Sequence, residues 1–207
     1  MTTTKNCPGR QLMALIREAI VETRGTIRWD SLRGEINRLL ESDSELAEYI
    51  DDDTPGLQSV LQVACEHSNA VDIAECLIRS VGFGRKGVMN YQGSCIGPGL
   101  APLHLACIRG SKELIPLLVQ YGADITCLDA SGETPLHTAA KWQQIECFLE
   151  LLRHGADIDK LDFKGKSARS RILDRLNGNV RLVDRIESAI EFARVNDLGA
   201  RSWSTVL

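Results

Sequence analysis

The most regular run of apolar and polar positions in the 207-residue chain begins at Thr134. Proline follows directly, and apolar side chains then recur at Leu136, Ala139 and Ala140, at spacings of three and four residues. Such spacing predicts a short helix with one small apolar face, and proline suits the first helical position, where its missing N–H costs nothing. Alanine on that face would let a neighbouring helix approach closely.

A second and broader apolar stripe follows over residues 144–153 and predicts a second helix. Its apolar members include Ile145, Phe148 and Leu152. Gly155 would end this helix in the left-handed conformation that glycine adopts readily. The two helices of one such pair cannot cover both of their apolar faces, so copies of the pair must stack on one another.

The same pattern occurs twice without a gap, once from Gly99 and once from Gly132. The copies read GLAPLHLACIRGSKELIPLLVQYGADITCLD and GETPLHTAAKWQQIECFLELLRHGADIDKLD, and equivalent residues such as His104 and His137 are 33 positions apart. A period of 33 with the motif T-P-L-H-x-A resembles the ankyrin family, most strongly over residues 97–162. The resemblance implies an all-α ankyrin-repeat solenoid of stacked helix pairs.

A weaker copy lies upstream and contains an unusually long connection. Leu61, Ala64 and Cys65 match Leu103, Ala106 and Cys107, but the offset is 42 residues. The extra residues fall mostly in a glycine-rich segment at 82–99. Long connections inside compact domains are usually functional or disordered, so we expect this segment to project from the stack or to be poorly ordered.

The two ends of the chain are expected to close the stack. Residues 163–193 keep the repeat phase but carry charge, as a terminal repeat with one face in water does, at Arg169, Arg171, Asp174 and Arg175. Residues 11–56 predict a diverged first unit with helices over 11–22 and 31–40, the second capped by Asp30 or Ser31. The prediction is one domain over 11–193 with about five units, at 11–56, 57–96, 97–129, 130–162 and 163–193, between a flexible segment at 1–10 and a frayed tail at 194–207.

Composition and charge narrow the class of protein. Hydrophobic residues make up 43% and charged residues 25% of the chain, which is ordinary for a soluble globular domain. The net charge of −4 argues against nucleic acid as the main ligand, because phosphate binding needs a basic face. Seven cysteines without a C-x-x-C pair predict free thiols in a reducing compartment. The N-terminus has no apolar run of the kind found in a secretory signal, and no apolar run elsewhere is long enough to span a bilayer. We therefore expect an intracellular protein, cytoplasmic or nuclear. We expect no membrane, metal, cofactor or small molecule among its ligands.

Two features could suggest chemistry, and each has a simpler explanation. His104 and His137 recur with the repeat and have no evident carboxylate or thiol partner, so a metal or catalytic role is disfavoured. The ankyrin resemblance implies instead that each ring bonds the backbone of a neighbouring turn. The segment GFGRKG at 82–87 lacks the G-x-x-x-x-G-K-[ST] motif of a phosphate loop. It is either a flexible finger or a partner contact made through Arg85, Lys86, Met89 and Tyr91.

Trp142 is the leading candidate for a partner contact. The resemblance implies that Trp142 and Lys141 face a concave groove, and a partly exposed tryptophan is a frequent interface anchor. The alternative is that Trp142 packs against its neighbours beneath the C-terminal cap. Residues in the same register and at the turn tips would line the same side: Ile108, Arg109, Asp129, Ala130, Ser131, Glu133, Phe163, Lys164, Lys166, Asp174 and Arg175.

The expected function follows from the family resemblance. Small proteins made almost entirely of ankyrin repeats are typically inhibitors, activating subunits or adaptors, so we expect a non-catalytic module that binds one or more folded proteins. One version is a regulatory subunit of a protein kinase complex in cell-cycle control, and another is an IκB-like protein that masks a transcription factor. A nucleotide-binding protein or an enzyme is the third possibility, and no motif supports it. The acidic stretch at 41–53 is interpreted as a solvated face, with binding of a basic segment as the alternative.

Overall fold

The computed structural model describes residues 7–21, 27–49, 59–67, 71–81, 86–92, 99–176 and 179–203. These residues form helices and turns without a strand, apart from an isolated bridge between Leu161 and Ser167. The all-α class predicted from the sequence is confirmed. None of the described helices is both long enough and apolar enough to cross a bilayer.

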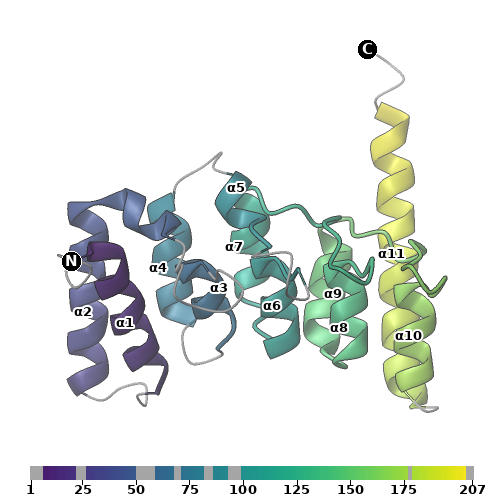
Figure 1. The fold of residues 1–207 in the computed structure, drawn as a ribbon. Helices are drawn as coiled ribbons and strands as arrows, with labels where there is room; N and C mark the ends of the chain where they lie inside the picture. The colour runs from purple at the N-terminus through teal and green to yellow at the C-terminus, as the bar shows by residue number, and fades with distance from the viewer. Residues whose placement is uncertain are drawn as a thin grey trace.

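The helices stack as successive antiparallel pairs, which run from the N-terminal end at the left to the C-terminal end at the right of Figure 1. The pairs are α1 (Pro8–Val21) with α2 (Ile27–Ser42), α3 (Val60–Cys65) with α4 (Val71–Val81), α6 (Pro102–Arg109) with α7 (Leu114–Gln120), α8 (Pro135–Lys141) with α9 (Ile145–Arg153), and α10 (Ala168–Arg175) with α11 (Val180–Trp203). A 3-10 helix, η2 (Ser44–Glu48), follows the first pair, and a short helix, α5 (Lys86–Met89), precedes the third.

The first helices of the last two units, α8 and α10, begin with side-chain caps. Pro135 is the first residue of α8, and the hydroxyl of Thr134 accepts a hydrogen bond from the backbone N–H of His137. Ser167 caps α10 in the same way, through the N–H of Ser170. These bonds satisfy backbone donors that a helix start otherwise leaves free.

The core repeats from one unit to the next. Leu103 and Ala106 of α6 are fully buried, as are their equivalents Leu136 and Ala139 of α8. In α10, Ile172 takes the place of Ala139 and is also enclosed. Burial of such side chains stabilises the fold by about 1.5–3 kcal/mol for each large aliphatic group. Because α8 packs against α6 and α10 of the neighbouring units as well as against α9 of its own unit, contacts between repeats help to hold the stack together.

The N-terminal pair differs in its bounds from the prediction. The first helix begins at Pro8 rather than at residue 11, since proline fits the first turn. The second begins at Ile27, so Asp30 and Ser31 lie inside it and neither is its N-cap. Its apolar face includes Trp29, which is buried although it lies N-terminal to the predicted start of this helix. The acidic stretch that follows is not wholly a solvated face, because η2 buries Ala47.

The expectation of a projecting loop is wrong for the part of 82–99 that the structure describes. Residues 86–89 form α5, and the Met89 side chain is fully buried. The amide of Asn90 donates to the carbonyl of Gly122 (3.2 Å), and the Gln92 amide donates to the carbonyl of Leu128 (2.7 Å). The segment is therefore packed onto the following repeat. Residues 82–85 and 93–98 lie outside the described residues.

The C-terminal unit also differs from the prediction. Helix α11 continues to Trp203, ten residues past the predicted end at 193, and so replaces most of the expected frayed tail. Figure 1 shows this helix rising beyond the ends of the other helices. Ile186 and Ile190 are its buried anchors, whereas Val180 and Arg185 face water. Residues 204–207 lie outside the described part.

Candidate functional site

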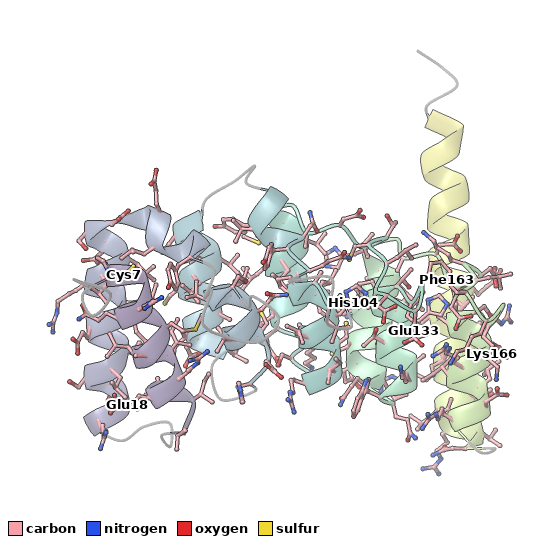
Figure 2. All side chains as sticks on the ribbon, in the orientation of Figure 1. Cys7, Glu18, His104, Glu133, Phe163 and Lys166 are labelled. Carbon is pink, nitrogen blue, oxygen red and sulfur yellow. The ribbon has the colours of Figure 1, made fainter. Side chains whose placement is uncertain are left out.

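The two periodic histidines form hydrogen bonds between repeats, as expected from the ankyrin resemblance. In His104, Nε2 donates to the carbonyl oxygen of Glu133 (3.0 Å), and Nδ1 accepts from the backbone N–H of Ala101 (3.3 Å). Figure 2 shows the ring beside Glu133 at the junction of two units. Because one ring nitrogen must accept, the bonded form is the neutral imidazole. Burial lowers the pKa of His104 and favours the same form.

His137 repeats this arrangement one unit later. Its Nε2 donates to the carbonyl oxygen of Lys166 (3.1 Å), and its Nδ1 accepts from the backbone N–H of Thr134 (3.2 Å). Burial lowers its pKa as well. Both rings thus join a helix start to the next turn, 29 residues ahead. No group of three or more His, Cys, Asp or Glu side chains in the described part of the chain could hold a metal ion.

Trp142 lies at the C-terminal end of α8, and 53% of its surface is exposed. The predicted exposure is confirmed, and the alternative of a tryptophan enclosed beneath the cap is wrong. Lys141 beside it is also exposed. Arg109 at the end of α6 occupies the position equivalent to Trp142 and lies 3.7 Å from Glu66 of the preceding unit. Since α8 packs between α6 and α10, these equivalent helix ends form a row along the stack.

Several residues at the neighbouring turn tips are exposed to solvent. Phe163 is 74% exposed, and Ser131 and Lys164 are exposed too. The Phe163 ring covers Gly132, where an added Cβ would lie 2.5 Å from a ring carbon. Ile108 is half-buried and packs against the core.

The prediction that Glu133 lines an exposed groove is wrong. Only 3% of the residue is exposed, and its carboxylate accepts from Nζ of Lys141 (3.1 Å) and from Arg171 (2.8 Å). Burial alone would raise the pKa of Glu133, but the Lys141 and Arg171 bonds together hold it below its usual value. Glu133 therefore supports the surface from beneath and orients Lys141. Asp129 is half-buried and accepts from the N–H groups of Ser131 and Glu133, so it shapes its own turn.

Arg171 was expected to be a solvent-exposed charge of the C-terminal repeat, but it is largely buried. Its side chain is only 13% exposed and also bonds the carboxylate of Asp162, a buried residue. Asp162 accepts in turn from the backbone N–H groups of Lys164 and Lys166, both at 2.8 Å. The sequence analysis did not single out Asp162. Its signal was the repeat itself, because Asp162 stands 33 positions after Asp129.

A hollow opens above this ion network, between α8 and α10. Its volume is about 240 Å³. The lining side chains are Lys141, Lys164, Lys166, Arg171, Asp174 and Arg175. All of these except Arg171 belong to the strip predicted around Trp142, so the structure brings five of its members together. Lys166 marks this region in Figure 2, near Phe163.

Of the residues predicted from the 82–99 segment, Tyr91 does not line this hollow. Tyr91 is half-buried, and its carbonyl accepts from the Gln62 amide (3.1 Å) inside the stack. Arg85 and the Lys86 side chain lie outside the described residues. The six cysteines of the described part are free, as predicted.

Comparison with known proteins agrees with the repeat pattern. Residues 61–162 match the sequence model of a family described as ankyrin repeats, in three copies. The tyrosine-protein kinase HTK16 of Hydra vulgaris is 34% identical over 79 residues, which cover 38% of this chain and 10% of that kinase. The chain thus resembles about a tenth of that relative.

Proposed function

This chain is an ankyrin-repeat protein, a module for protein–protein interaction, and we propose that it acts as a regulatory subunit or adaptor that holds one folded protein against its inner helix ends and turn tips. The observation that carries this proposal is Trp142, which stays 53% exposed at the end of α8. Tryptophan is usually largely buried, and an exposed one with an adjacent cation is a common anchor of an interface.

The surroundings of Trp142 support a folded protein as the partner. Lys141, which directly precedes Trp142 in the chain, is held by an ion pair with the buried Glu133. Arg109 occupies the equivalent helix end one unit earlier and Arg175 one unit later. Charged side chains near an exposed aromatic side chain give orientation and specificity to an interface.

Within this function we propose regulation of a protein kinase. Its support is the similarity to a segment of a tyrosine-protein kinase, which shows this type of sequence within a kinase polypeptide. The catalytic activity in that protein's name belongs to that protein. An IκB-like inhibitor of a transcription factor is the competing identity, and the captured partner decides between them.

The test is capture of the partner from native extract by the tagged full-length chain. Trp142→Ala is compared with Val21→Ala, which truncates another exposed apolar side chain at the far end of the stack. We expect the partner to be lost with Trp142→Ala alone, while circular dichroism shows both variants folded. Retention of the partner by folded Trp142→Ala would overturn this site, and a partner that is neither a kinase component nor kinase-bound would overturn the kinase assignment.

A further inference from the structure

The strongest unexplained feature is the charge of the hollow between α8 and α10. It is lined by five cationic side chains and one carboxylate, Asp174. Two further carboxylates, Glu133 and Asp162, lie in the network beneath it. Even when all three acids are counted against the five bases, the hollow retains two positive charges, in a chain whose net charge is −4. The positive charge is therefore local and not a consequence of overall composition.

The cations of the hollow fall into two groups with different tasks. Lys141 and Arg171 are bound to the buried carboxylates beneath, so their positions are fixed. Lys164, Lys166 and Arg175 are exposed and form no ion pair with any residue that the structure describes. The hollow thus combines a rigid charged floor with three cationic side chains that are free to bind an anion.

Arg171 cannot lose its charge in this setting. Burial alone would lower its pKa, but Asp162 and Glu133 hold the pKa above its usual value. The guanidinium therefore keeps its positive charge beneath the hollow, and that charge favours an anion above it.

We propose that this hollow receives an acidic segment of the partner protein, a short run of Asp and Glu side chains whose carboxylates pair with Lys164, Lys166 and Arg175. The proposal rests on the proposed function, because it assigns the chemistry of the partner at the C-terminal end of the same surface. Lys141 connects the two features: it lines the hollow and directly precedes Trp142 in the chain.

The limited extent of the positive charge favours a carboxylate segment over a nucleic acid. The hollow is a local depression of about 240 Å³ whose cations come from one turn and two helices, whereas nucleic-acid binding requires a continuous stripe or face of cations. The chain as a whole has a net charge of −4, which disfavours a polyphosphate backbone around the hollow.

The experiment titrates the full-length chain with a labelled acidic peptide of alternating Glu and Asp, followed by NMR amide shifts and fluorescence anisotropy. Comparison ligands are the matching Gln and Asn peptide, a phosphoserine peptide and a DNA duplex. The test variant is Lys164→Glu with Lys166→Glu. Its matched control is Arg153→Glu with Arg181→Glu, the same charge change at exposed residues outside the hollow.

We expect the acidic peptide to shift the amides of residues 164–166 and to bind about tenfold more weakly to the test variant than to its control, as reversal of two surface charge pairs predicts. Binding should also weaken as salt is raised. The proposal would be overturned if the acidic peptide caused no amide shifts up to millimolar concentration, or if both variants lost affinity equally. It would also be overturned if the chain preferred the neutral peptide, the phosphopeptide or the duplex. Failure of the proposed function is distinct, because it appears as retained partner with Trp142→Ala whatever the peptide does.

Discussion

The carboxylate of Glu133 and the guanidinium of Arg171 lie 2.8 Å apart and join two consecutive repeats. Glu133 precedes α8, whereas Arg171 lies in α10 of the next unit. In the preceding repeat the position of Arg171 is occupied by Thr138. The last unit has therefore exchanged a small buried side chain for an ion network with Asp162, which ties the cap to the unit before it.

Arg171→Ala should destabilise the protein by about 2–3 kcal/mol, somewhat less than a fully enclosed pair. The cause is that the substitution leaves Glu133 and Asp162 buried without their shared cation. Urea unfolding measures the loss, and Arg175→Ala, an exposed arginine of the same helix, is the control with a change near zero. Equal losses in the two variants would show that the network adds no stability.

The histidine bonds predict a pH dependence of stability between pH 7.5 and 5.5. Burial lowers the pKa values of both His104 and His137, so the unfolded chain takes up protons that the folded chain refuses. Their contribution is fully present above the unfolded value of about 6.5 and is lost as pH falls towards the folded pKa values. The loss should approach about 1 kcal/mol for each histidine at pH 5.5.

Urea midpoints at pH 7.5 and 5.5 measure this effect in the wild type and in a His104→Gln, His137→Gln variant. The variant should be less stable at pH 7.5 but much less sensitive to pH over this range. The same pH dependence in both proteins would mean that other groups cause it. Glu133 and Asp162, whose pKa values are also lowered, lose their contribution only at more acidic pH.

The inner repeats could be predicted from the sequence because local signals and packing agree there. Thr134 and Pro135 start a helix, Gly155 ends one at a φ of 83°, and the 33-residue period fixes which residues face each other. The buried state of Glu133 could not be read in this way. It depends on Arg171, 38 residues later, and a charged residue at a turn tip normally indicates exposure.

The expectation that the 82–99 segment projects from the stack or is poorly ordered failed for its described residues, 86–92. Met89 decides the matter, because its side chain is fully buried. Asn90 then satisfies backbone groups of the next unit, accepting from the N–H of Asp124 (2.6 Å). The Asn90 contact has no local sequence signal, because its partners Gly122 and Asp124 come from the next repeat.

Met89→Ala should therefore cost about 2–3 kcal/mol, as expected for truncation of a buried methionine. Val88→Ala, at a half-buried position of the same helix, should cost less than half as much. Thermal or urea unfolding of the full-length chain gives both values. A loss below about 0.5 kcal/mol for Met89→Ala, the range of ordinary surface substitutions, would mean that α5 does not pack as described.

Gly132 and Gly165 allow backbone strain to be separated from steric exclusion at the turn tips. They hold equivalent positions with nearly equal φ values, 72° and 71°. An added Cβ at Gly165 meets open space, whereas at Gly132 it meets the Phe163 ring at 2.5 Å. Gly165→Ala should thus cost about 1 kcal/mol from the left-handed backbone alone.

Gly132→Ala should cost more than Gly165→Ala, because Phe163 must also move away from the turn. The added loss should disappear in the background of Phe163→Ala, where no ring covers residue 132. Urea unfolding of the four proteins completes this double-mutant comparison. If Gly132→Ala and Gly165→Ala cost the same, the Phe163 ring is mobile in solution and its contact with the turn contributes nothing to stability.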